Sequence, residues 1–162
     1  MVIILFGVTG AGKTEVGRAL ANDLGWSFYD ADQFHAPESV DKMRRGIPLT
    51  DDDRWPWLDS LRAKIEQCIQ RGENAVLACS ALKAAYRDHL AVDGEVKLVH
   101  LKGDYALIAA RLRHRREHFM NPDLLRSQFD TLEEPEGEGA LILDVRATPV
   151  ELVRTIRDRL NV

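Results

Sequence analysis

The sequence predicts an α/β fold of three layers, in which helices cover both faces of a five-stranded, mostly parallel sheet. Two observations carry this prediction. Short apolar runs alternate with segments of helical apolar spacing along all 162 residues, and this alternation is typical of parallel strands joined by helical crossovers. The first run, Val2–Phe6, is apolar at every position, as expected for a strand that is buried on both faces.

The other elements follow in alternating order, and the chain length fits one domain. Apolar residues recur at helical spacing from Leu58 to Ile69, and Gly72 ends that helix. Thr148 begins the last helix with a capping box. We expect strands at residues 2–6, 27–30, 75–79, 96–101 and 141–144, and helices at residues 13–24, 37–45, 55–71, 82–90, 105–116, 122–132 and from 149 onward.

Composition narrows the classes of function. The 26 acidic and 22 basic residues give a net charge of −4, which disfavours general nucleic-acid binding because that needs a basic face. The apolar start is too short for a signal peptide, and no apolar run reaches the length of a membrane span. Cys68 and Cys79 have no motif spacing, so we expect reduced, half-buried thiols. We therefore expect a cytoplasmic protein with no nucleic-acid or membrane partner.

A phosphate-binding motif of the form G-x-x-x-x-G-K-[ST] follows the first strand and opens the first helix. Its glycines let backbone N–H groups turn inward around phosphate oxygens, and the start of a helix favours anions. Lys13 is placed to reach the β- and γ-phosphates of ATP, and the Thr14 hydroxyl to ligate Mg²⁺. The predicted nucleotide-binding residues are Gly7, Val8, Thr9, Gly10, Ala11, Gly12, Lys13 and Thr14.

The motif alone leaves the use of the nucleotide open, because GTPases, motors, kinases and regulatory modules share it. The chain has no Asn-Lys-x-Asp segment, which a GTPase would need for guanine. An ATPase motor usually has an acid at the end of the third strand, but here the chain reads Cys79-Ser80. These differences favour a small-molecule kinase in which Asp32, just after the second strand, helps to hold the metal.

Basic side chains gather between residues 111 and 118. Phosphoryl transfer needs cations around the migrating group, so we expect a lid at about residues 111–124. A solvated basic helix face is the alternative. The cluster contains Arg111, Arg113, His114, Arg115, Arg116 and His118.

Further motifs follow the phosphate loop in order. They include Asp30-Ala31-Asp32-Gln33-Phe34-His35, Asp51-Asp52-Asp53-Arg54-Trp55-Pro56-Trp57, Cys79-Ser80-Ala81-Leu82-Lys83, Tyr86-Arg87-Asp88, Arg115-Arg116-Glu117-His118-Phe119 and Ser127-Gln128-Phe129. With these motifs the sequence resembles the gluconate kinase family over nearly its whole length. The resemblance implies an ATP:gluconate 6-phosphotransferase with a nucleoside-monophosphate-kinase-like P-loop fold, Mg²⁺ dependence, a substrate-binding segment at about residues 35–60 and a homodimer. The sequence departs from the family's usual residues at Ala31, Ala36, Glu117 and Asn121.

Gluconate carries a carboxylate at the end opposite the reacting hydroxyl, so its site needs a cationic anchor at some distance from the γ-phosphate. Arg54 and Arg87 are the predicted anchors, since a guanidinium binds a carboxylate bidentately. Lys83 is a third candidate, with a solvated position on its helix as the alternative. For Arg54 the alternative is an ion pair with the acidic run 51–53, and for Arg87 it is a surface pair with Asp88.

The predicted catalytic residues are Lys13, Asp32, Arg111 and Arg115. Asp32 orients or deprotonates the 6-hydroxyl, or holds Mg²⁺ through water, and a helix cap is the alternative. His35 is expected to hydrogen-bond substrate hydroxyls, with a purely structural histidine as the alternative. Arg111 and Arg115 match lid positions of the family and are expected to stabilise the transferred phosphate. Two other functions stay open: a related small-molecule kinase of the shikimate or antibiotic type, and a catalytically silent nucleotide-binding module.

Overall fold

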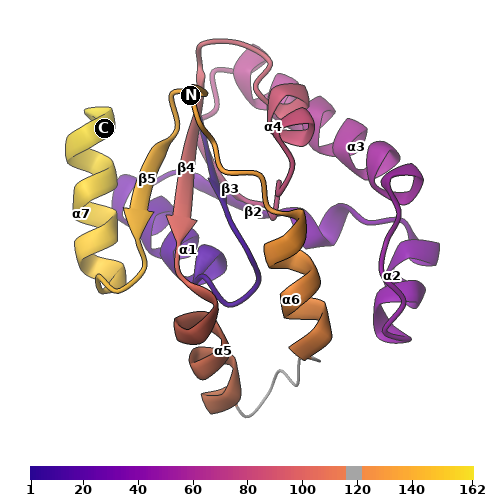
Figure 1. Ribbon diagram of the computed structural model, residues 1–162. Helices are drawn as coiled ribbons and strands as arrows, with labels where there is room; N and C mark the ends of the chain where they lie inside the picture. Colours follow the sequence, from indigo (N-terminus) through magenta and orange to yellow (C-terminus); the bar gives the residue numbers. More distant parts are fainter. Residues whose placement is uncertain (116–121) are drawn as a thin grey trace.

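The computed structural model describes residues 1–115 and 122–162, and within them five strands form one sheet (Figure 1). The order across the sheet is β2-β3-β1-β4-β5. Each pair of neighbouring strands is parallel, which confirms the predicted sheet and makes its described part entirely parallel. The strands are β1 (Val2–Phe6), β2 (Ser27–Asp30), β3 (Ala75–Ala78), β4 (Val96–Lys102) and β5 (Leu141–Asp144).

Strand β1 occupies the centre of the sheet, and all of its residues are buried. Val2, Ile4 and Phe6 belong to the core on one face, whereas Ile3 and Leu5 belong to the core on the other. This division follows from the two-residue period of a strand. The continuous apolar run is therefore required by the helices that cover both faces, as predicted.

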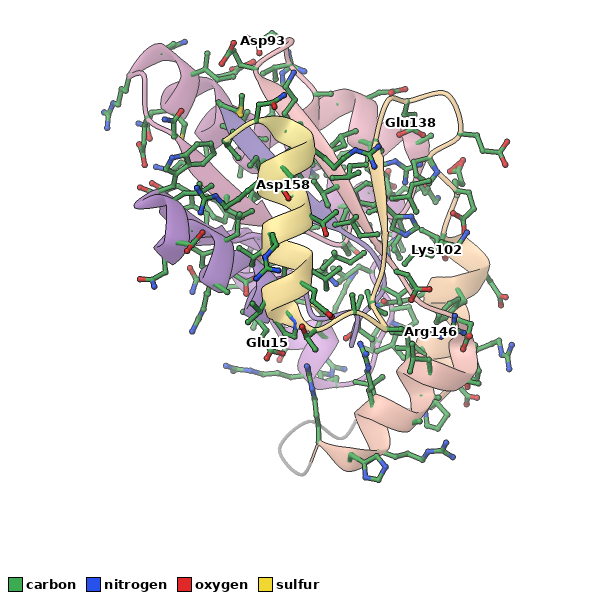
Figure 2. The ribbon with its side chains drawn as sticks, turned by 90° about the vertical axis from the view of Figure 1, so that its left-hand side faces the viewer. Glu15, Asp93, Lys102, Glu138, Arg146 and Asp158 are labelled. Carbon is green, nitrogen blue, oxygen red and sulfur yellow. The ribbon has the colours of Figure 1, made fainter. Side chains whose placement is uncertain are left out.

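The two cores are closed by different helices (Figure 1). On one face α3 and α4 contribute the buried side chains, and on the other α1 and α7 do so. Figure 2 shows α7 lying over the sheet, with Arg146 at the turn that precedes it. The helices are α1 (Lys13–Leu24), α2 (Pro37–Arg44), α3 (Asp51–Gln70), α4 (Ala84–Leu90), α5 (Tyr105–His114), α6 (Pro122–Thr131) and α7 (Pro149–Leu160).

Two local features differ from the prediction. Helix α3 begins at Asp51 rather than at residue 55, because Thr50 forms a capping box with Asp53. Thr50 Oγ1 accepts from Asp53 N at 3.2 Å, and Thr50 N donates to Asp53 Oδ2 at 2.9 Å. The helix starts at this box although Pro56, near its start, lacks a backbone N–H donor. A short 3₁₀ turn, Ala31–Phe34, also follows β2 and was not predicted.

The two cysteines are free thiols and both are buried, which is deeper than the half-buried positions predicted for them. Burial raises the pKa of the Cys79 thiol to about 12, so this thiol stays protonated at neutral pH. In the part of the chain that the structure describes, no helix is long and apolar enough to cross a membrane.

The strand register brings several chain segments to one edge of the sheet. Asp30 of β2 lies opposite Ala78 of β3, and Ala78 lies opposite Leu5 of β1. The residues that follow these three strands therefore meet at the same edge. In open α/β sheets, ligands bind beyond the carboxyl ends of the strands, so this edge is where a site is expected.

Candidate active site

The loop between β1 and α1 has the backbone that a phosphate cradle needs. Gly7 has φ of +144° and Gly10 has φ of +79°, conformations that disfavour other residues. A Cβ at Gly7 would lie 2.7 Å from Leu101 O, and one at Gly10 would lie 3.0 Å from the Leu112 side chain. Glycine is thus needed at both positions, and α1 begins at Lys13 with its free N–H groups at the end of this loop.

Lys13 folds back over the loop that precedes it. Its Nζ donates to Val8 O at 2.8 Å, so the ammonium lies within the cradle. Desolvation lowers the pKa of Lys13, while the negative charges of Asp32 and Asp30 raise it. The predicted phosphate-binding lysine therefore sits next to two carboxylates at the carboxyl edge of the sheet.

Asp30 and Asp32 form an acid pair beside Thr14. Asp30 Oδ2 accepts from Thr14 Oγ1 at 3.2 Å, and Asp30 Oδ1 accepts from Asp32 N at 3.0 Å. Desolvation and the charge of Asp30 raise the pKa of Asp32, and Lys13 opposes the increase. The Asp32 side chain is 84% exposed, so water moderates this effect. Asp30, which sequence reasoning did not include in the site, is the acid in direct contact with the predicted metal-binding hydroxyl.

His35 lies next to Asp32. Its Nε2 is 4.0 Å from Asp32 Oδ1, and its side chain is 5% exposed. The ring stacks on Trp57 with centroids 4.3 Å apart, and Trp57 Nε1 donates to Ala31 O at 2.7 Å. Burial lowers the pKa of His35, which keeps the ring neutral at pH 7. Its buried Nδ1 has no hydrogen-bond partner among the described residues.

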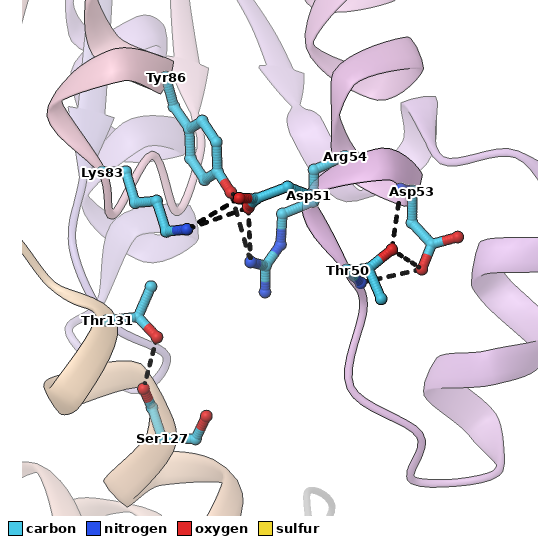
Figure 3. A network of polar contacts seen from close by, with 8 residues as sticks. All are labelled: Thr50, Asp51, Asp53, Arg54, Lys83, Tyr86, Ser127 and Thr131. Carbon is cyan, nitrogen blue, oxygen red and sulfur yellow. Dashed lines mark hydrogen bonds and ion pairs between the residues drawn. The ribbon is translucent and has the colours of Figure 1, made fainter.

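A second polar cluster, centred on Asp51, joins the start of α3 to the start of α4 (Figure 3). Lys83 Nζ donates to the Asp51 carboxylate at 3.0 Å, and the Tyr86 hydroxyl also donates to it. Arg54 Nη1 lies 4.0 Å from Asp51 Oδ1 and 3.5 Å from Tyr86 Oη. Two predicted substrate residues, Arg54 and Lys83, are thus brought together, and Asp51 neutralises one of their two charges. We call Asp51, Arg54, Lys83 and Tyr86 the Asp51 cluster.

Arg87 is placed differently from the prediction. Its side chain is fully buried, and its guanidinium makes a bidentate pair with Glu138, with Nε–Oε2 and Nη2–Oε1 distances of 2.7 and 2.8 Å. Its other donors bind the carbonyl oxygens of Ala81, Leu82 and Glu133 at 2.8–3.0 Å. All five N–H donors of the guanidinium are therefore occupied within the protein. The expectation that Arg87 binds the substrate carboxylate is corrected, and so is its alternative of a surface pair with Asp88.

The predicted lid is described only in part. Arg111 Nη2 donates to Val145 O, which ties α5 to the turn after β5. Arg115 is exposed, and its positive charge contributes to lowering the pKa of Lys13. The structure therefore brings the charge of Arg115 near the phosphate loop, whereas Arg111 is held by a backbone carbonyl. Arg116, Glu117, His118 and Asn121 lie outside the described residues.

Sequence reasoning missed three further polar residues around the site. Asp30 could have been found, because it ends the strand next to β3 and its register places it at the carboxyl edge. Asp51 was named only within the acidic run 51–53 as the alternative partner of Arg54, and the structure contains that ion pair. Tyr86 carries no signal of its own, because it meets Asp51 only when α3 and α4 pack together. The motifs named the segments that contain these residues, but their contacts come from the fold.

Comparisons with known proteins agree with this arrangement. A family model described as shikimate kinase matches residues 9–138. A probable gluconokinase from Rattus norvegicus is 46% identical over 155 residues, which cover 84% of each chain. The thermosensitive gluconokinase of Escherichia coli (strain K12) is 43% identical over 136 residues, which cover 83% of this chain and 73% of that protein.

A solved structure shows the same relationship in three dimensions. The crystal structure of a gluconokinase from Sinorhizobium meliloti 1021 matches with a TM-score of 0.85 and 45% identity, over 94% of this chain and 87% of that one. The parallel sheet, the glycine loop and the ordered motifs of this chain are therefore those of a known group of kinases. With identity above 40% over more than four fifths of its length, the chain belongs to the gluconokinase family of P-loop small-molecule kinases.

Proposed function

We propose that this protein transfers the γ-phosphate of ATP to the 6-hydroxyl of D-gluconate and forms 6-phosphogluconate and ADP. The observation that carries the proposal is the pairing of a phosphate loop with a separate cationic cluster. The loop, with Lys13 and the acid pair, suits the triphosphate. The Asp51 cluster, with half-buried Arg54 and Lys83 side chains, suits the carboxylate of a sugar acid.

The residues divide the reaction between them. The 6-hydroxyl oxygen forms a bond to the γ-phosphorus, the bond from that phosphorus to the β–γ bridging oxygen breaks, and ADP leaves. Asp32 orients the hydroxyl and accepts its proton, and neutral His35 holds a neighbouring substrate hydroxyl. Lys13 and Arg115 offset the negative charge of the transferred group, since the transition state is stabilised chiefly by positioned cations. Arg54 and Lys83 bind the carboxylate at the far end.

The oxygen atoms near the loop fit Mg²⁺. Thr14 Oγ1 and Asp30 Oδ2 lie 3.2 Å apart, and hydroxyl and carboxylate oxygens are ligands that this ion prefers. Among residues 1–115 and 122–162, no group of three or more His, Cys, Asp and Glu side chains could hold a metal unaided. This suits an ion that would be bound mainly by phosphates and water, with Thr14 and Asp30 as the protein's contribution. Bound there, Mg²⁺ would offset the negative charge of the phosphates.

The cellular setting and the assembly form part of the same proposal. Two buried free thiols suit a reducing compartment such as the cytoplasm. We also propose a homodimer, on the basis of the resemblance to this family, and light scattering coupled to size-exclusion chromatography tests it. A mass near 18.3 kDa would contradict the dimer.

An acceptor panel tests the activity. The purified protein is incubated with Mg-ATP and either gluconate, other sugar acids, polyols or shikimate, and release of ADP is followed. We expect a strong preference for gluconate and loss of turnover in Lys13→Ala. No stimulation by any acid, with ATP still bound, would favour the silent nucleotide-binding module. A preference for shikimate would favour the other kinase class.

Arg54→Ala tests the carboxylate anchor. Loss of a charged hydrogen bond is expected to raise the KM for gluconate by about tenfold or more, with the KM for ATP nearly unchanged. Arg157→Ala is the matched control, because Arg157 of α7 makes an exposed ion pair with Asp23, which lies in the last turn of α1, at the other end of that helix from Lys13 and Thr14. An unchanged gluconate KM in Arg54→Ala would remove this residue from the site.

A further inference from the structure

The side chain of Gln128, on α6, binds the backbone of the phosphate loop. Gln128 Oε1 accepts from Thr9 N at 2.7 Å, across 119 positions of sequence. Because the backbone N–H can only donate, the oxygen and not the nitrogen of the carboxamide must face the loop. Gln128 belongs to the Ser127-Gln128-Phe129 motif, for which the proposed reaction assigns no role.

Helix α6 is itself held firmly against the body of the protein. Leu125 is 2% exposed and belongs to the core beneath α1 and α7. Phe129 packs edge-on against Tyr105 of α5, and the Arg126 guanidinium lies 4.0 Å from the centre of the same Tyr105 ring. Gln128 therefore projects from a helix that is anchored to α5 through Arg126 and Phe129, which lie before and after it in the sequence.

The end of α6 is tied to the segment that carries Lys83. Glu133 N donates to Leu82 O at 2.8 Å, and buried Arg87 binds the carbonyl oxygens of both Glu133 and Leu82. Leu82 directly precedes Lys83, a member of the Asp51 cluster. Figure 3 shows α6, with Ser127 and Thr131, in the same region as this cluster. Helix α6 thus contacts the phosphate loop, and Glu133, two residues after the helix, contacts the segment that carries the proposed carboxylate site.

The contact uses the Thr9 N–H of the predicted nucleotide-binding loop, and not the N–H groups of Gly12 and Lys13. Thr9 lies before Gly12 and Lys13, whose N–H groups stand at the start of α1 and are the ones that bind an anion there. The next residue of the loop is supported as well, because Gly10 packs against Leu112 and Ile108 of α5. Residues Thr9 and Gly10 of the loop therefore contact α6 and α5, and the Gln128 side chain supplies the hydrogen bond among these contacts.

We propose that Gln128 is a positioning residue, which fixes the front of the phosphate loop relative to α6 and thereby aligns the γ-phosphate with the sugar-acid site. The inference rests on the proposed function, which names gluconate as the substrate that receives the phosphate. It makes Gln128 act through Thr9 and the loop, rather than through contact with the reacting atoms. Loss of the contact should lower the rate of transfer more than it lowers the affinity for ATP.

Three variants test this role. Gln128→Met keeps the length of the side chain but removes the acceptor, and Gln128→Glu keeps an acceptor oxygen. Asp130→Asn is the matched control, because Asp130 is exposed on the same helix. For each protein, kcat and KM with gluconate, the Kd for Mg-ATP, the melting temperature and the exchange rate of the Thr9 amide proton by NMR are measured.

We expect Gln128→Met to lower kcat by about fivefold, the effect of one neutral hydrogen bond, while the Kd for Mg-ATP stays within about twofold. Thr9 should exchange faster in Gln128→Met than in the wild type or in Asp130→Asn. Gln128→Glu should restore kcat at saturating ATP but raise the KM for ATP, since its charge repels phosphate. A wild-type kcat in Gln128→Met, or an unchanged Thr9 exchange rate, would overturn the proposal.

The proposed function and this inference fail separately. The exchange rate of the Thr9 amide proton is measured without any phosphoryl-acceptor substrate. It therefore reports on the Gln128–Thr9 contact even if gluconate is not phosphorylated. If the wild type prefers shikimate in the acceptor panel, the proposed function is wrong, and the same kcat comparison is made with shikimate. A merely structural role for Gln128 would lower the melting temperature without changing kcat at a temperature where each variant is folded.

Discussion

Asp30 and Asp32 are two residues apart, yet their carboxylates make different contacts. Asp30 is hydrogen-bonded to Thr14 and to the backbone of Asp32, so its carboxylate is directed at the metal-binding hydroxyl. Asp32 is the more exposed partner at the end of the pair and lies beside His35. At the residue scale, we propose that the motif Asp-x-Asp divides into an acid that faces the metal, Asp30, and an acid that faces the acceptor hydroxyl, Asp32.

Substitution should separate the two roles. Asp30→Asn is expected to raise the Mg²⁺ concentration for half-maximal activity, because the ion loses a charged oxygen ligand. Asp32→Asn is expected to lower kcat on the order of 100-fold, the lower range for loss of a general base, with little change in Mg²⁺ dependence. Mg²⁺ titrations of initial rates check both. Equal effects of the two variants on Mg²⁺ dependence would contradict the division.

The pH profile gives an independent check on Asp32. Its pKa is raised above 3.8 by desolvation and by Asp30, and the ionised form is the one that accepts a proton. The kcat/KM for gluconate should therefore fall as the pH is lowered through a value above 3.8. This acidic limb should be absent from the residual activity of Asp32→Asn.

Helix α3 shows how a local element prepares the site. The Thr50 capping box starts the helix at Asp51, and this start places both Asp51 and Arg54 in the first turns. Asp53, the partner in the box, also binds Lys42 of α2 at 2.9 Å. Hydrogen bonds from Thr50 and Lys42 lower the pKa of Asp53 to about 2. The cap thus orders the region where the Asp51 cluster is assembled.

A pair of matched variants tests the function of this cap. Thr50→Ala and Thr148→Ala each remove the side-chain half of a capping box, at the starts of α3 and α7. Each should lower the free energy of unfolding by about 1 kcal/mol. Only Thr50→Ala should also raise the KM for gluconate, because α7 lies away from the site. Urea denaturation and steady-state kinetics measure the two effects, and equal KM values would contradict the link.

At the scale of the whole molecule, Arg87 connects parts of the chain that are distant in sequence. Its five donors join the loop after β3 to the segment between α6 and β5. The loop contains Ala81, whose φ of +37° is rare for a residue with a side chain. Such a backbone persists where the surrounding structure holds it, and the Arg87 bond to Ala81 O supplies one such restraint.

Removing this connection should destabilise the whole fold. Arg87→Met leaves Glu138, whose side chain is 17% exposed, without its charged partner, and we expect a loss of about 3–5 kcal/mol in the free energy of unfolding. The double variant Arg87→Met/Glu138→Met should recover part of it. Chemical denaturation checks both. A fully stable Arg87→Met with a greatly raised gluconate KM would instead support direct substrate binding.

A buried histidine links global stability to pH. His100 is 1% exposed and stacks on Phe6, and burial lowers its pKa from 6.5 to about 4, against the opposing charge of Glu134. Lys102 and Arg87 lower it further. Between these two pH values the unfolded chain binds more protons than the folded one, so stability falls as the pH falls.

Between pH 6.5 and 4, protonation of His100 is expected to lower the free energy of unfolding by about 3 kcal/mol, at 1.36 kcal/mol for each pH unit. His100→Phe keeps an aromatic ring against Phe6 but cannot titrate. Its free energy of unfolding should therefore depend less on pH in this window than that of the wild type. Denaturation curves at pH 7 and 5 measure the difference, and equal slopes would show that other groups dominate.

Individual residues show why prediction from sequence succeeded in some places and failed in others. Asp32 and His35, which were both assigned to the substrate site, lie close together because they stand within one short turn after β2. Arg54 and Lys83 both pair with Asp51, since each lies at the start of a helix on the same face of the sheet. Their binding of the substrate carboxylate stays a prediction. The prediction for Arg87 failed because the sequence shows that an arginine is present, but not that Glu138, 51 positions later, pairs with its guanidinium.

The sequence by itself determined the features that depend on residues close together in the chain. The glycine loop, the alternation of apolar runs and helical segments, and the capping boxes are read within a few residues, because backbone conformation and periodic burial depend on near neighbours. The ordered motifs identified the family on the same basis. Only the tertiary structure decided which long polar side chains serve the site and which serve the fold. That choice depends on contacts such as Gln128 with Thr9 and Arg87 with Glu138, which exist only after the parallel strands bring distant segments to one edge.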